Sequence, residues 1–187
     1  MSPLLGSIGG LSARAYGFQT ATAARFEPDG AYDALATVTV PSGGVTSIQF
    51  AAIPNTYKHL QLRVIQMTSG TVDPRMRFND DSTTSNYYMH SIYNNASALS
   101  GYVVNNMYIP YLYNESTQPA VAVIDILDYA STTKNKTVRD LGGYDANGSG
   151  YLFYRSGGWF STAAITKIDL HNITFGENTQ VSLYGVK

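Results

Sequence analysis

From Ala34 onward, apolar residues recur at every second position far more often than at the roughly 3.6-residue spacing of a helix. The runs are rich in Val, Ile, Thr, Tyr and Phe, which favour strands. Clusters such as "PSGG", "NESTQP" and "DANGSG" separate them and are typical of turns. The pattern predicts short strands at Ala34–Val40, Thr46–Phe50, His59–Ser69, Arg75–Asn79, Tyr87–Tyr93, Tyr102–Tyr113, Ala120–Tyr129, Thr137–Tyr144, Gly150–Arg155, Ala164–Asn172 and Gln180–Val186. Such regular spacing indicates an all-β fold, an antiparallel, jelly-roll-like β-sandwich.

Alternation within the strands predicts which faces are buried. In "HLQLRVIQM", the even-numbered residues from Leu60 to Val64 should face the core, and the odd-numbered residues from Gln61 to Ile65 should be mostly wet. "AVAVIDILDY" is apolar nearly throughout, which indicates a central strand with its two aspartates at the wetter end. In "DANGSG", the pair Asn147-Gly148 favours a two-residue hairpin turn.

The 187 residues are enough for one well-cored domain with an additional segment. We place the sandwich at residues 34–187 and an extended N-terminal arm at residues 1–33, where no period is sustained. A loose leader is one interpretation of this segment. Its large apolar residues favour an arm that orders on a partner's surface. The arm residues expected to contact a capsid or other partner are Leu4, Leu5, Ile8, Leu11, Tyr16 and Phe18.

Composition excludes several classes of partner. The chain has 12 basic and 13 acidic residues, so it creates no long-range field that would attract nucleic acid or anionic lipid. It has no run of about 18 apolar residues, so we predict no membrane partner. It also has no Cys, which excludes thiolate metal sites and Cys nucleophiles.

No motif in the chain indicates catalysis. The three histidines, His59, His90 and His171, fall in three different predicted strands without a metal-binding spacing. Nucleophile-elbow and phosphate-loop motifs are absent. We place the paired aspartates at turns or strand ends, where Asp is common; the pairs are Asp80/Asp81, Asp125/Asp128 and Asp140/Asp145. We predict no catalytic residue, no cofactor and no metal ion, and we keep a glycan-cleaving enzyme as an alternative hypothesis.

The stretch "RFNDDSTTSNYYMHSIY" brings acidic groups, a His and aromatics together. We interpret it as a hairpin with an exposed tip, in which Asn79, Asp80 and Ser82 hydrogen-bond their own backbone. Asp80, Asp81 and Tyr87 are therefore candidates for an exposed contact loop.

The chain has 15 Tyr, and Tyr serves equally in sheet packing and in contact surfaces. We interpret Tyr151 and Trp159 as candidate surface aromatics. Tyr and Trp on an open face also suit sugars, so a carbohydrate-binding sandwich that recognises a host glycan through Tyr87, Tyr88 or Trp159 is a second alternative.

Several stretches resemble a known family. "MSPLLGSIGGLSARAYGF" resembles the N-terminal leader of virion structural proteins from tailed phages, especially marine and cyanobacterial ones. "ATVTVPSGGVTSIQFAAIPNTYKHLQLR" resembles their first strands, and "FNDDSTTSNYYMH" resembles a recurring Phe-Asn-x-Asp hairpin in them. "ITKIDLHN" and "NTQVSLYGVK" resemble their closing strands, while the likeness is weakest from about Ser97 to Gly158.

The resemblance implies a non-enzymatic virion component that is assembled in the host cytoplasm. It implies a homo-oligomer, with a trimer favoured, that contacts the major capsid protein or other virion proteins. In one placement the protein is a capsid decoration or cement protein whose arm lies on the shell. In the other it is a tail or tail-fibre component that meets the host surface. The chain lacks the long heptad repeat of a fibre shaft, which favours decoration.

Overall fold

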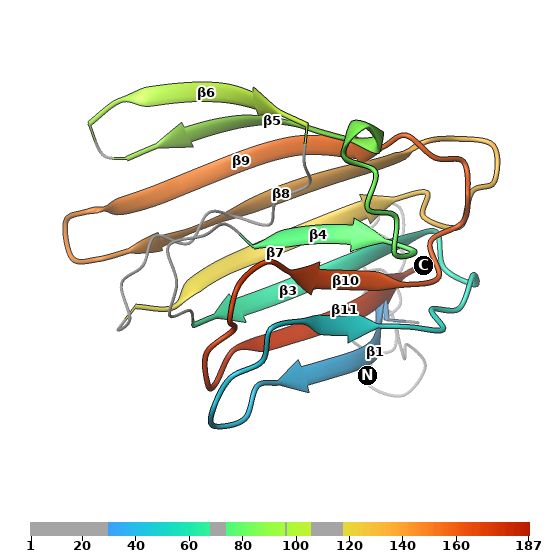
Figure 1. Ribbon diagram of the computed structural model, residues 1–187, viewed down its shortest axis with the longest axis horizontal. Coiled ribbons are helices and arrows are strands. Elements are labelled where there is room, and N and C mark those ends of the chain that lie inside the picture. Colours follow the sequence, from blue (N-terminus) through green and yellow to red (C-terminus); the bar gives the residue numbers. More distant parts are fainter. Residues whose placement is uncertain (1–29, 68–73, 96, 106–117) are drawn as a thin grey trace, which may run out of the picture. The chain divides into compact units, whose positions relative to one another are not determined.

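The computed structural model describes residues 30–67, 74–95, 97–105 and 118–187. Its strands form two antiparallel sheets (Figure 1). The larger sheet has the order β1, β11, β3, β7, β8, β9, β5, β6, with bounds β1 Tyr32–Thr39, β11 Gln180–Val186, β3 His59–Gln66, β7 Ala120–Leu127, β8 Lys136–Asp145, β9 Gly150–Trp159, β5 Tyr87–Asn94 and β6 Leu99–Val104. The smaller sheet has the order β2, β10, β4, with bounds β2 Ile48–Phe50, β10 Ile168–His171 and β4 Arg75–Phe78. A single 3-10 turn, η1, spans Thr84–Asn86.

The prediction of an all-β, two-sheet antiparallel sandwich is therefore confirmed. The unequal sheets, of eight and three strands, do not establish the connectivity of a jelly roll, and that finer expectation stays a prediction. The hairpin predicted at Asn147-Gly148 joins β8 to β9. Both residues have positive φ, 55° and 102°, as the favoured hairpin turns require.

The core lies between the smaller sheet and one face of the larger sheet. Leu60, Leu62 and Val64 of β3 are buried, as the alternation predicts. Phe78 and Ile168 of the smaller sheet belong to the same apolar cluster. In Figure 1 the smaller sheet lies in front of β7, β3 and β11, while β5, β6 and much of β8 and β9 extend beside it. The inner face of the larger sheet thus carries the core of the sandwich.

Strand β7 is central, as predicted, because β3 and β8 pair with its two edges. Its two faces nevertheless differ. Ile124 and Ile126 are buried in the core, whereas Val121 and Val123 on the opposite face are exposed. The smaller sheet packs on the inner face of the larger sheet, and within the described ranges no second layer packs on the outer side of this apolar strand.

Two expectations about chain organisation need correction. The stretch from Arg77 to Tyr93 is not a hairpin, because β4 pairs with β10 in the smaller sheet while β5 pairs with β6 and β9 in the larger one. It is a corner that carries the chain from one sheet to the other. The strand expected at Tyr102–Tyr113 begins earlier, at Leu99, and ends at Val104. Residues 106–113 lie outside the described residues.

The first described strand begins at Tyr32, two residues before the predicted start of the sandwich. The N-terminal arm predicted at residues 1–33 thus falls almost wholly outside the described residues. This includes all six of its candidate contact residues, Leu4, Leu5, Ile8, Leu11, Tyr16 and Phe18. Residues Tyr32–Lys187 form one unit, and the sandwich is described as that unit alone.

Candidate interaction surface

The outer face of the larger sheet carries two adjacent rows of apolar side chains. Strand register aligns Ile65, Val121, Gly143 and Leu152 across β3, β7, β8 and β9 in the first row. The same register aligns the residues of the second row, which are Val123, Leu141, Tyr154 and, on β5, Ile92. Because alternate residues of each strand are committed to the core, these rows necessarily point away from it.

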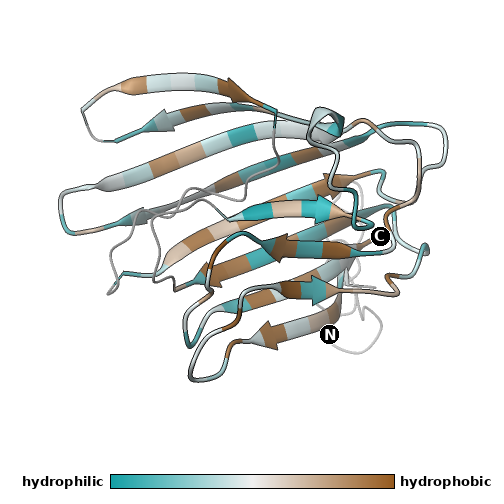
Figure 2. Cartoon of the chain, in the orientation of Figure 1, coloured by the Kyte–Doolittle hydropathy of each residue, from teal (hydrophilic) through white to brown (hydrophobic). Residues whose placement is uncertain are grey.

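We define the outer apolar patch as six of these residues: Ile65, Val121, Val123, Leu141, Leu152 and Tyr154. Their exposed fractions lie between 41% and 60%. Scattered exposed apolar residues are ordinary, but a contiguous apolar group of this kind often marks an interaction site. Figure 2 shows hydrophobic positions recurring along the strands of the larger sheet. The patch is therefore the strongest candidate interaction surface in the part of the chain that the structure describes.

A depression of ≈ 840 Å³ lies within the patch, where β8 carries Gly142 and Gly143. Gly143 has φ +153°, and a Cβ atom there would lie 2.0 Å from the carbonyl oxygen of Tyr151. Only glycine fits this backbone, so its row has a gap between Val121 and Leu152. The depression is therefore a consequence of the β8 to β9 pairing and has an apolar lining.

A polar row of Gln61, Asp125 and Arg139 borders the patch, next to Arg63, which the register places at the β3 end of the second apolar row. The side chain of Gln61 donates a 2.8 Å hydrogen bond to Asp125 and accepts one of 2.9 Å from Arg63. The Arg63 guanidinium also lies 4.5 Å from the ring centre of Tyr184, within the range of a cation–π contact. Arg139 stands directly opposite Asp125 on the next strand. The border carries both signs of charge, so it adds no strong field to the apolar surface.

The predicted contact loop is the corner between the two sheets, and most of it serves the fold. The Asp81 carboxylate accepts hydrogen bonds from Trp159 Nε1 at 2.7 Å, from Asn86 Nδ2 at 2.8 Å and from the Thr83 amide at 2.9 Å. Partial burial opposes ionisation of Asp81, but these hydrogen bonds outweigh it and lower the pKa to about 2. The Tyr87 hydroxyl donates to the Asp81 carbonyl at 3.0 Å. The corner is therefore anchored to β9 and β5.

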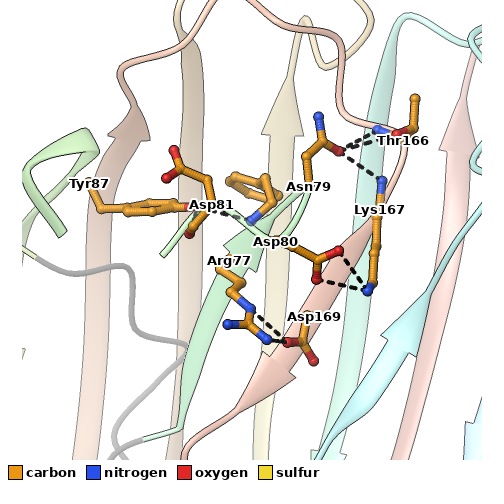
Figure 3. Close-up of polar contacts among 9 residues, drawn as sticks. Arg77, Asn79, Asp80, Asp81, Tyr87, Thr166, Lys167 and Asp169 are labelled. Atoms are coloured by element: carbon orange, nitrogen blue, oxygen red, sulfur yellow. Dashed lines mark hydrogen bonds and ion pairs between the residues drawn. The ribbon is translucent and has the colours of Figure 1, made fainter. Parts of the chain in front are cut away.

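On the other side of the corner, Asn79 and Asp80 bind the segment before β10 (Figure 3). The Asn79 side chain accepts from the amides of Thr166 and Lys167 at 2.9 and 3.1 Å and donates to the Ala164 carbonyl at 2.8 Å. Asp80 accepts from Lys167 Nζ at 2.8 Å. Both residues have positive φ, which Asn and Asp tolerate best among residues with a side chain. The expectation that Asn79 and Asp80 bond their own backbone is therefore wrong.

Three candidate site residues are placed differently from the sequence interpretation. Trp159 is 3% exposed and Tyr87 5%, so neither is a surface aromatic or part of an exposed loop. Their rings pack on each other and on Phe78, with centroid separations of 6.5 and 5.6 Å for Tyr87–Trp159 and Phe78–Trp159. Of the three residues expected in an exposed contact loop, Asp81 is partly buried, Tyr87 is buried and only Asp80 is exposed. Tyr151 is half-buried, with its ring stacked on Phe153 at 5.6 Å.

A buried polar pair lies on the inner face of the larger sheet. Alternation along β8 would have located it, because Asp140 points to the same side as the apolar residue Val138. Asp140 on β8 lies directly opposite Arg155 on β9. Burial raises the pKa of Asp140 to about 7, against the opposing charge of Arg155. Arg155 is 1% exposed, and its guanidinium lies 4.2 Å from the ring centre of Phe153. Sequence reasoning had placed Asp140 at a turn or strand end, which is wrong.

The remaining sequence candidates do not converge. His59, His90 and His171 lie on β3, β5 and β10, and the described residues contain no group of His, Asp or Glu that could hold a metal ion. No helix within the described ranges is long and apolar enough to cross a membrane. A small cleft of ≈ 190 Å³ lies beside Arg77 and His171, but Arg77 is already paired with Asp169 at 2.6 Å.

No family model fits the sequence, and no curated protein is similar enough to count as a relative.

Proposed function

We propose that this chain is a non-enzymatic structural protein of a phage virion, and specifically a capsid decoration or cement protein that binds and stabilises the assembled shell. It would be assembled in the host cytoplasm and would act in the virion. The virion assignment is supported by the sequence resemblance. The self-association that belongs to this role is supported by one structural observation above all, which is the outer apolar patch, on a side of the larger sheet that no other layer of the described residues covers.

In this proposal the two parts of the chain have different tasks. The N-terminal arm, residues 1–33, lies on the major capsid protein or another virion protein and supplies adaptable apolar contact area. The sandwich supplies contacts between copies, in a homo-oligomer that we expect to be a trimer. Neither task needs a cofactor. A capsid protein and further copies of the chain are therefore the proposed partners.

The placement can be tested by imaging particles that carry a tagged copy of the chain at its C-terminus. Strand β11 holds Val186 in the sheet, so a tag placed after Lys187 needs a short flexible linker to spare the strand. Label distributed regularly over the shell is the expected result. Label confined to the tail or its fibres would replace decoration by the tail alternative, and its absence from purified particles would overturn the virion proposal.

The arm can be tested separately by removing residues 1–25 and measuring binding to particles that lack the protein. We expect the affinity to fall at least tenfold while circular dichroism and thermal unfolding of the sandwich are unchanged. A matched control replaces Leu4, Leu5 and Ile8 by Ser in the full-length chain, which retains the length but removes apolar area. Undiminished binding of the truncated protein would show that the arm is not the clamp.

The carbohydrate-binding alternative has a weaker structural basis than the sequence suggested. Two of the aromatic residues on which it depended, Tyr87 and Trp159, are buried and serve the corner. Tyr88 remains partly exposed next to Phe160, with ring centres 4.6 Å apart. Sub-millimolar binding on a glycan array that disappears in Tyr88→Ala would favour this alternative.

A further inference from the structure

The size of the outer apolar patch matches what a protein interface requires. Six side chains of roughly 150–200 Å² that are about half exposed offer on the order of 500 Å² of apolar surface, and a standard interface takes about 800 Å² from each partner, a little over half of it apolar. Ile92, 53% exposed, extends the same surface onto β5. The patch could therefore supply the whole apolar part of a stable interface.

The patch contains both a projection and a recess. Leu152 on β9 is 60% exposed and stands beside the depression that Gly143 leaves in its row. A surface that carries a knob and a hole side by side can pack against a copy of itself, since two-fold symmetry presents each knob to the partner's hole. The aligned packing of two sheets, about 10 Å apart, uses this type of interdigitation.

The border is also compatible with a second copy. Arg63, Asp125 and Arg139 give it both signs of charge, and Gln61 links two of them by hydrogen bonds. The whole chain has a net charge of −1. A copy facing this border therefore meets no block of like charge, and the surface offers no field that would select an acidic or basic partner instead.

We propose that the outer apolar patch is the contact between two copies of this chain, which pack with their larger sheets face to face. The contact centres on β7, β8 and β9, with Val121, Leu141 and Leu152 in its interior. This inference concerns a two-fold contact alone, which is separate from the trimer contact expected from the resemblance, and it stands whether or not the virion placement is correct. It also gives an apolar β7 strand the covering layer that the smaller sheet supplies only on its inner side.

Single cysteines test the geometry directly, because the chain has no Cys of its own. Leu141→Cys, Leu152→Cys and Val123→Cys are prepared in the full-length protein and treated with a short bismaleimide linker at micromolar concentration. We expect covalent dimers from at least one of the three, since residues near a two-fold axis approach their own symmetry mates. Val103→Cys on β6 is the matched control, being 60% exposed on the same face but four strands from β7, about 19 Å away. Dimers formed equally by Val103→Cys, or by none of the variants, would overturn the proposal.

Charge insertion provides a second measurement. Val121→Lys should weaken self-association at least a hundredfold in sedimentation equilibrium, while Val103→Lys, the same substitution outside the patch, should leave it within threefold. Both sites are exposed in the single chain, so thermal unfolding of the monomer should change little in either variant. A native chain that is monomeric at about 100 micromolar, where a contact with micromolar Kd would be nearly saturated, or a Val121→Lys protein that still associates normally, would sink the inference. If Val121→Lys retains self-association but loses particle binding, the patch contacts the shell and not a second copy.

Discussion

Trp159 Nε1 donates a 2.7 Å hydrogen bond to the carboxylate of Asp81, although 78 residues separate the two in sequence. Asp81 lies in the corner between β4 and β5, and Trp159 ends β9, so this bond ties the crossing between the sheets to the larger sheet. Stacking of the indole with Tyr87 and its contact with Phe78 surround the bond with aromatic rings. The acidic cluster that looked like a binding site is thus part of the scaffold.

Asp81→Asn should destabilise the protein by about 1–2 kcal/mol at pH 7, because a charged acceptor of three hydrogen bonds is replaced by a neutral amide. The folded-state pKa of about 2 lies below the ordinary 3.8, so the ionised group stabilises the fold above about pH 4 and loses this effect as the pH falls toward 2. The difference between variant and native protein should therefore shrink at low pH. Urea unfolding of both proteins at pH 7 and pH 3 measures this difference in the free energy of unfolding.

The control for this experiment is Asp80→Asn, which changes the neighbouring, exposed carboxylate whose partner is Lys167. Its effect should be much smaller at both pH values, because an exposed ion pair is screened by solvent. If both variants lose the same free energy of unfolding, the hydrogen bonds to Asp81, including that from Trp159, stabilise the fold no more than the exposed ion pair of Asp80.

Asp140→Asn should remove a pH dependence from the stability. The folded-state pKa of about 7 is higher than the ordinary 3.8, so the folded protein holds a proton that the unfolded chain releases. This contribution is fully present below about pH 4 and is lost as the pH rises through 7. We expect the free energy of unfolding of the native protein to fall over that range, and the variant to show a flatter profile. Asp145→Asn at the end of the same strand should retain the native slope.

Arg77→Met should be strongly destabilising, by about 3–5 kcal/mol, because it leaves the Asp169 carboxylate buried without its cation. The Asp169 side chain is 1% exposed and receives the Arg77 guanidinium at 2.6 Å (Figure 3). Lys134→Met, which breaks the exposed pair with Asp128, should cost far less. The two variants are compared by their midpoints of unfolding in guanidinium chloride. Similar midpoints would contradict the proposal that the buried Arg77–Asp169 pair stabilises the fold more than the exposed pair.

Gly143→Ala tests the backbone that creates the depression in the outer patch. An added Cβ would lie 2.0 Å from the Tyr151 carbonyl oxygen, so the β8 to β9 pairing must shift, and we expect a loss above about 2 kcal/mol. Gly148→Ala is the control, since φ there is also positive at 102° but nothing lies within 4 Å of the added atom. Its cost should be only about 1 kcal/mol, from backbone strain alone. Thermal unfolding of the two variants separates steric contact from conformational preference.

Local patterns predicted the strands well because the features that identify a strand are local. Successive side chains of a strand point to opposite faces, so Leu60, Leu62 and Val64 could be assigned to one buried face before any partner strand was known. Asn147-Gly148 likewise specifies a turn through its own dihedral preferences. The strand near Tyr102 was misplaced because Asn105-Asn106, which directly follow its last residue Val104, were taken as part of the strand on account of the apolar and aromatic residues after them.

The candidate site could not be predicted in the same way. The residues around Tyr87 and Trp159 in the sequence do not indicate that these side chains are buried, since Tyr and Trp also occur on exposed sheet faces. Their burial follows from the corner between the sheets, which folds the Asp81 carboxylate against the indole. The apolar residues at Val121 and Leu141 were visible in the sequence, but both interiors and interfaces use such residues, and alternation cannot distinguish them.

The sequence by itself determined the all-β class, nearly every strand and the composition of each strand's two faces, because these depend on neighbours along the chain. Only the tertiary structure decided which of those faces is covered. Which face is covered depends on pairing between strands far apart in sequence, such as β3 with β11, and on the side of the larger sheet against which the three-stranded sheet packs. Whether a side chain is buried depends on what packs against it, and an alternating pattern does not specify that partner.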